Sequence, residues 1–141
     1  MDRKKLLIRI ASLIFFIFIL NYLAGKFYWY SAIWYFDIIM HFLGGLWAGL
    51  ASIWFFSRIS DSFSDSLSSI SFNIVLKILL GVLVIGIAWE IFELYFINHI
   101  ASNPFDLLDT ISDIFFDLSG GLFAILYFFN QIMPKNKNKV E

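Results

Sequence analysis

The sequence contains no cysteine and only two histidines, and charged residues make up only 15% of its 141 residues. The absence of cysteine excludes disulfides, thiolate metal ligands and cysteine nucleophiles. Charged residues make up about 25% of an average soluble protein, so the low share argues against a soluble domain. The few basic residues form no patch of the kind that binds DNA or RNA, and we therefore expect no nucleic-acid partner.

Apolar residues make up 60% of the chain and include 18 phenylalanines. A helix needs about 20 consecutive apolar residues to cross a bilayer. Four stretches approach or exceed this length, at about residues 6–24, 30–56, 74–96 and 107–132. We therefore predict an all-α, multi-pass integral membrane protein. Its single domain, residues 1–141, is expected to be a bundle of four transmembrane helices with membrane lipids as partners.

Residues 1–24 combine a basic start with an apolar run, as a signal peptide does. The run is longer than the usual 7 to 15 residues, so we interpret it as a retained helix. Arg9 lies one turn inside this span, from where its side chain can reach back to the membrane surface.

The distribution of basic residues predicts the orientation in the membrane. Cytoplasmic loops are rich in lysine and arginine. Of the basic residues in the loops and at the termini, all fall on one side of the membrane except Lys26, which falls on the other. We therefore expect a protein of the cell membrane with both termini in the cytoplasm. The serine-rich loop at 57–72 would share that side, either as a flexible linker or as a short helix at the membrane surface. The basic residues that we expect on the cytoplasmic side are Arg3, Lys4, Lys5, Arg58, Lys77, Lys135, Lys137 and Lys139.

The fourth span begins with the motif "SNPFDLLD". Asn103 is suited to the N-cap, Pro104 to the first helical position and Asp106 to the third, where a carboxylate interacts favourably with the helix dipole. This local role is sufficient to explain Asp106, which we do not assign to a functional site.

Asp109, Asp113 and Asp117 follow at strict four-residue steps. Residues four apart share one face of a helix and advance about 6 Å per step, so these acids run into the predicted span along one face. Gly121 and Ala124 continue that face with small residues, which is typical of a helix that packs closely against another. We therefore expect the three aspartates to point into the bundle.

The second and third predicted spans also carry polar residues at helical spacing. Asp37 and His41 are four residues apart in the second, and glycines follow deeper in the same span. Glu90 and Glu93 are three residues apart near the end of the third, with Gly86 one turn earlier. Because consecutive spans run in opposite directions, these acids, His41 and the three aspartates share one half of the membrane. With both termini in the cytoplasm, this is the outer half.

Six carboxylates and one imidazole therefore share one layer. A charged acid at mid-bilayer costs about 2.5 to 3.5 kcal/mol, so the cluster must bind cations, share protons or open to water. Oxygen ligands with a single imidazole suit a divalent ion such as Mg²⁺, Mn²⁺, Ca²⁺ or Zn²⁺. We predict a metal site whose ligands are Asp37, His41, Glu90, Glu93, Asp109, Asp113 and Asp117.

Three motifs of the chain resemble those of a known family. D-x-x-x-H-F-x-G-G (37–45), E-x-x-E (90–93) and D-T-x-x-D-x-x-x-D-x-x-G-G (109–121) are similar to the YjdF-like bacterial inner-membrane proteins. The first motif and part of the third also resemble VanZ-like proteins, a family associated with teicoplanin resistance. Against that pattern, Asp117 stands where asparagine is expected. Neither resemblance implies a particular reaction for this chain.

Three functions fit these patterns. The first is a metal-dependent membrane hydrolase or transferase that acts on a lipid-linked phosphate or ester, with Glu90 or Glu93 as the catalytic base. The second is a cation or proton transporter that uses the same acids. The third is a membrane protein in which the cluster is a structural polar network. Any of the three could also form a homo-oligomer.

Overall fold

The computed structural model describes residues 3–59, 72–98 and 106–131. Within these ranges the chain contains helices and no strands, and four helices are long and apolar enough to cross a membrane. The predicted all-α fold with four membrane helices is therefore confirmed. Most of the serine-rich loop (60–71), together with Asn103 and Pro104, lies outside the described residues. The elements are α1 (Arg3–Phe27), α2 (Trp29–Ala32), α3 (Phe36–Ile59), α5 (Phe72–Phe92), η1 (Glu93–Asn98) and α7 (Leu107–Gln131).

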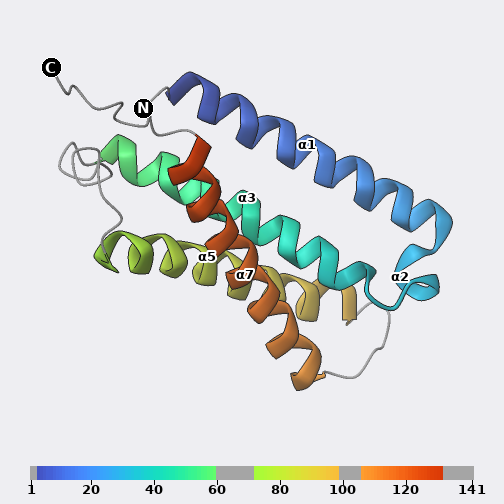
Figure 1. The fold of residues 1–141 in the computed structure, drawn as a ribbon. Coiled ribbons are helices and arrows are strands. Elements are labelled where there is room, and N and C mark those ends of the chain that lie inside the picture. The colour runs from blue at the N-terminus through green and yellow to red at the C-terminus, as the bar shows by residue number, and fades with distance from the viewer. Residues whose placement is uncertain (1–2, 60–71, 99–105, 132–141) are drawn as a thin grey trace, which may run out of the picture.

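The helix α3 lies at the centre of the bundle and packs against α1, α5 and α7. Figure 1 shows α1 and α5 on opposite sides of α3, while α7 crosses both α3 and α5. The short helix α2 connects α1 to α3 at one end of the bundle, which is also the end where α7 begins. We call it the α2 end.

Small residues allow α3 and α7 to approach each other closely. A Cβ atom on Gly45 would overlap the backbone of Asp117, and one on Gly120 would overlap the carbonyl of Phe42. Deeper in the bundle, a Cβ on Gly49 would lie 2.7 Å from the Cβ of Ala124. Close backbone contact at small residues is a principal source of helix association in membranes, and here it holds together the two helices with most of the polar residues.

The end of the bundle opposite α2 is filled mainly by apolar side chains from all four long helices. Arg9 of α1 also lies in this half, where its Nη1 donates a 2.6 Å hydrogen bond to the Tyr127 hydroxyl of α7. Outside this core, aromatic residues such as Phe15 and Phe18 are largely exposed, as expected for a surface that faces lipid. The buried core consists of Leu6, Ile10, Leu50, Ile53, Ile74, Ile78, Ala124, Ile125 and Phe128.

The start of α7 differs from the prediction. Asp106 precedes the helix, and its Oδ1 accepts hydrogen bonds from the backbone N–H groups of Leu108, at 2.9 Å, and Asp109, at 3.4 Å. Asp106 is therefore the N-cap residue and not the third residue of the helix, because its own carboxylate satisfies the first free N–H groups. Its exclusion from the candidate site is unaffected.

Aromatic and polar contacts fix the connection between α1 and α3. The Tyr30 hydroxyl donates a 2.9 Å hydrogen bond to Asn21 Oδ1 on α1, and its ring packs edge-on against Phe36 with centroids 5.0 Å apart. Tyr28 adopts a left-handed backbone conformation, with a φ of 56°, that turns the chain at this point. These contacts position the first turn of α3, which carries Asp37.

Candidate metal centre

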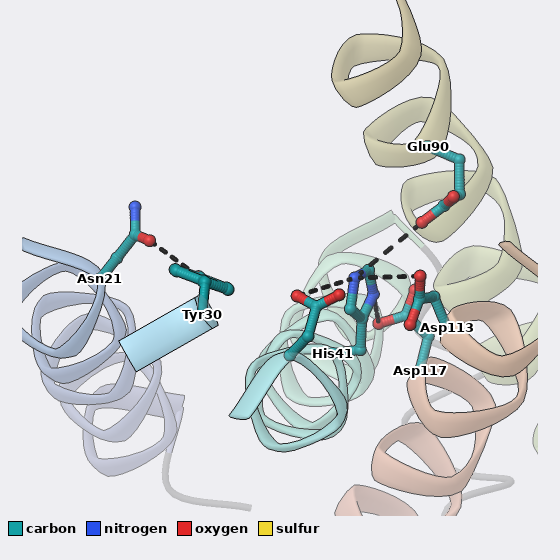
Figure 2. Close-up of polar contacts among 7 residues, drawn as sticks. Asn21, Tyr30, His41, Glu90, Asp113 and Asp117 are labelled. Atoms are coloured by element: carbon teal, nitrogen blue, oxygen red, sulfur yellow. Dashed lines mark hydrogen bonds and ion pairs between the residues drawn. The ribbon is translucent and has the colours of Figure 1, made fainter. Parts of the chain in front are cut away.

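His41 lies in the second turn of α3 and is almost completely buried, with 5% of its surface exposed. Figure 2 shows its ring beside Glu90 of α5 and the Asp113 and Asp117 side chains of α7, with dashed lines marking its contacts to them. The sequence brings these groups together because each helix carries its polar residues on the face with small residues, and these faces pack against one another. His41 is therefore surrounded by carboxylates from three helices.

Three carboxylates face the Nε2 atom of His41. Asp113 Oδ2 lies 3.7 Å away, Asp37 Oδ1 lies 3.9 Å away and Glu90 Oε1 lies 4.0 Å away. These separations exceed the 2.7 to 3.2 Å of ordinary N–H···O hydrogen bonds. Three carboxylate oxygen atoms therefore approach the Nε2 atom, and none of them lies at hydrogen-bond distance from it.

Asp117 faces the other nitrogen atom of the imidazole, Nδ1. Its Oδ1 is 3.6 Å from Nδ1, and the residue is 6% exposed. Asp117 and Asp113 come from one face of α7 but meet different nitrogen atoms of the same ring. Asp113 therefore lies beside the Nε2 atom, whereas Asp117 lies beside the Nδ1 atom.

The end of α5 contributes both glutamates. Glu90 lies in the last turn of α5, and Glu93 is the first residue of the π-helix η1. The Glu90 Oε1 atom is buried and has no hydrogen-bond partner among the described residues. Short π-helical segments within helices often occur at functional sites, and here the segment begins at a residue of the cluster.

Two groups of side chains have the geometry to bind a metal ion. The first comprises Asp37, His41 and Asp113, and the second comprises His41, Glu90 and Glu93. Within each group, one ligand atom per residue lies within 4.8 Å of the others. Ligands on opposite sides of one ion are about 4.2 Å apart for Mg²⁺ and about 4.8 Å apart for Ca²⁺. Each of the two groups is therefore compact enough for a single cation.

Asp109 is a predicted ligand that forms no ion pair with His41 in the described part of the chain. It is exposed in the first turn of α7 and belongs to neither group. Asp37, whose side chain is 37% exposed, also lies towards the α2 end. The cluster is therefore buried around His41 and Asp113 and becomes more accessible towards this end of the bundle.

Two neighbours of the cluster were not identified from the sequence. Thr110 lies close to the Glu90 side chain, and its position three residues before Asp113 was the available signal. Tyr30 lies in α2, outside the membrane-spanning helices, where burial and the nearby Asp37 and Glu93 raise its pKa to about 12. Its hydroxyl therefore stays protonated at neutral pH.

Comparison with known proteins identifies one family. The family model described as "Predicted membrane protein (DUF2238)" matches residues 2–133, nearly the whole chain. This match is consistent with the resemblance to YjdF-like proteins, whereas the resemblance to VanZ-like proteins receives no support. No curated protein and no solved structure matches the chain.

Proposed function

The chain belongs to the DUF2238 family of predicted membrane proteins, and we propose that it binds a divalent metal ion at the buried histidine and acts as a lipid-directed hydrolase or transferase. The observation that carries this proposal is the convergence of three carboxylates on His41 Nε2. Acidic groups within a membrane are costly unless a positive charge or water compensates them. A bound cation would offset the charge of these side chains.

The ligands in this proposal are Asp37, His41 and Asp113, with Glu90 and Glu93 on the adjacent helix. A divalent ion in this position would polarise a phosphoryl or carbonyl oxygen and lower the pKa of a bound water. Glu90 or Glu93 would then accept the proton of that water as general base. Glu90 Oε1 suits this role because it is buried next to the proposed site and has no hydrogen-bond partner among the described residues.

A lipid substrate fits the position of the cluster in the bundle. The more accessible members of the cluster lie near the α2 end, where Trp34 and Tyr35 are exposed. Tryptophan and tyrosine are typical of the interface between membrane and water, where a lipid phosphate or ester group is located. If both termini are cytoplasmic, this end faces the outer leaflet.

A transporter requires a polar path to the opposite side of the membrane. In the described part of the chain, Leu50, Ile53, Val82, Ile125 and Phe128 are at most 3% exposed and fill the bundle beyond the cluster. This apolar packing favours a site that is open on one side. We therefore prefer the enzyme to cation or proton transport.

Elemental analysis of the full-length protein, purified in detergent and by gel filtration, tests the metal site. We expect about one divalent ion per chain in the wild type and none in Asp113→Asn. Asp106→Asn is the matched control, because it removes an acid from the same helix while asparagine still caps the helix. Asp106→Asn should retain the metal.

The outcomes separate the three functions. If Asp113→Asn loses the metal and Asp106→Asn retains it, assays on lipid phosphates and esters are justified. Hydrolysis or transfer that is present in the wild type and absent in Asp113→Asn would support the enzymatic function. Full metal content in Asp113→Asn would contradict the site. If the wild type also binds no added metal, ion flux in liposomes would support transport, and its absence would support a structural network.

A further inference from the structure

Asp117 differs from the other carboxylates in the environment of its side chain. Glycines of two neighbouring helices surround it: a Cβ on Gly44 would lie 3.8 Å from its Oδ1, and one on Gly86 would lie 2.6 Å from its Oδ2. Gly45 contacts its backbone. Asp117 is therefore held at the point where α3, α5 and α7 meet, and any side chain at Gly86 would displace its carboxylate.

The two nitrogen atoms of a neutral imidazole have different roles. One carries a proton and donates a hydrogen bond, and the other has the lone pair that binds a metal. Asp117 Oδ1 faces Nδ1 at 3.6 Å, whereas Asp37, Glu90 and Asp113 face Nε2. A movement of the ring of about 0.5 Å towards Asp117 would give a hydrogen bond of ordinary length.

We propose that Asp117 is a positioning residue and not a metal ligand: it accepts the Nδ1–H hydrogen bond of His41 and thereby directs the Nε2 lone pair towards Asp37, Asp113 and Glu90. This inference rests on the proposed metal site. Histidine ligands commonly donate their second N–H group to a carboxylate, which fixes the ring orientation, and loss of such a partner typically weakens metal binding 10- to 100-fold. The glycines around Asp117 provide the space for this contact.

The position of the imidazole proton tests the proposal directly. The full-length protein is labelled with ¹⁵N-histidine in detergent micelles and carries His99→Gln, so that His41 gives the only histidine signals. NMR spectra are recorded without metal and with Zn²⁺. We expect Nδ1 to be protonated in both states and Nε2 to shift on addition of Zn²⁺. An unprotonated Nδ1, or coordination through Nδ1, would overturn the proposal.

Calorimetric titration with Zn²⁺ and Mn²⁺ separates a positioning residue from a ligand. We expect Asp117→Leu to weaken binding about 10- to 100-fold, and Asp117→Asn to lose less because its amide oxygen still accepts a hydrogen bond. Asp113→Asn should abolish binding. If Asp117→Asn abolishes binding as completely as Asp113→Asn while both variants remain folded, Asp117 is a ligand and the proposal is wrong.

Failure of the proposed metal site would be visible separately. A wild type that binds neither ion contradicts the proposed function, and the metal-free NMR spectrum still reports whether Nδ1 carries a proton. In that case Asp117→Leu must change the chemical shift of Nδ1, whereas Asp109→Asn, which alters an exposed acid on the same helix, must leave it unchanged. An Nδ1 signal that Asp117→Leu does not affect would contradict the contact itself.

Discussion

Gly86 on α5 lies so close to Asp117 on α7 that a Cβ on the glycine would stand 2.6 Å from the Asp117 Oδ2 atom. The position of the carboxylate beside His41 therefore depends on the absence of a side chain on a neighbouring helix. Because the contact is with the end of a side chain, substitution of this glycine should move the carboxylate more than the helix backbone.

Gly86→Ala should weaken binding of divalent metal about tenfold, since it displaces the carboxylate that orients His41. Isothermal titration with Mn²⁺ measures the change. Gly25→Ala is the control, because a Cβ at that position has no described atom within 4 Å outside its own stretch of helix. Equal affinities in the two variants would argue against a link between Gly86 and the centre.

Gly45→Ala should destabilise the fold by about 1 to 3 kcal/mol or more, the usual effect of an oversized side chain in a packed interior. Its added Cβ would overlap the Asp117 backbone, which can yield only if α3 and α7 separate. Reversible unfolding in mixed detergent micelles would measure the loss. A free energy of unfolding equal to that of the wild type would show that the two helices are not in close contact.

Tyr127→Phe should reduce stability by about 0.6 to 2 kcal/mol, a range typical of hydrogen bonds between membrane helices. The variant leaves Arg9 Nη1 without the acceptor that lies 2.6 Å away. Tyr22→Phe, which alters a tyrosine that is 71% exposed, serves as the control. In a double-mutant cycle, Arg9→Met combined with Tyr127→Phe should show coupling, and strictly additive effects would rule out the contact.

Tyr30 should ionise near pH 12. Because the pKa of Tyr30 in the folded state lies above the ordinary tyrosine value of 10.0, the contribution of Tyr30 to stability is complete below pH 10 and is lost as the pH rises through 12. Spectrophotometric titration of phenolate in the wild type and in Tyr30→Phe measures the difference. The titration curve of Tyr30→Phe should lack the ionisation step near pH 12. If the variant instead lacks a step near pH 10, the raised pKa is contradicted.

Removal of metal should lower the thermal stability of the wild type. An ion present at 100 times its Kd stabilises the folded state by about 2.7 kcal/mol. The transition temperature should therefore fall when EDTA is added and recover when Mn²⁺ is restored in excess. Asp113→Asn should show neither change, and an equal response in that variant would place the bound ion elsewhere.

The sequence was sufficient for the architecture because a membrane helix must satisfy all its backbone hydrogen bonds internally. Four apolar stretches of adequate length therefore predict four helices before any tertiary contact is known. The four-residue spacing of Asp113 and Asp117 also predicts that both lie on one face of a helix. Both are buried in the bundle.

The sequence did not determine where α7 begins or which acids approach the histidine. Helix ends depend on local capping, and Asp106 caps the helix with its own carboxylate. Asp109 shares the face of Asp113 but lies one turn closer to the end of the helix, where α7 leaves it exposed. Helical spacing determines the direction in which a side chain points from the helix axis. It does not determine how far the neighbouring helices extend beside that side chain.

The amino-acid sequence by itself determined that this is a membrane protein with four apolar helices, three of which carry acids on faces with small residues. Only the tertiary structure decided that Asp113 lies beside Nε2 of His41 and Asp117 beside Nδ1. The physical reason is that periodicity is a property of a single helix. Which carboxylate faces which nitrogen atom of the imidazole depends on how three helices pack around the ring.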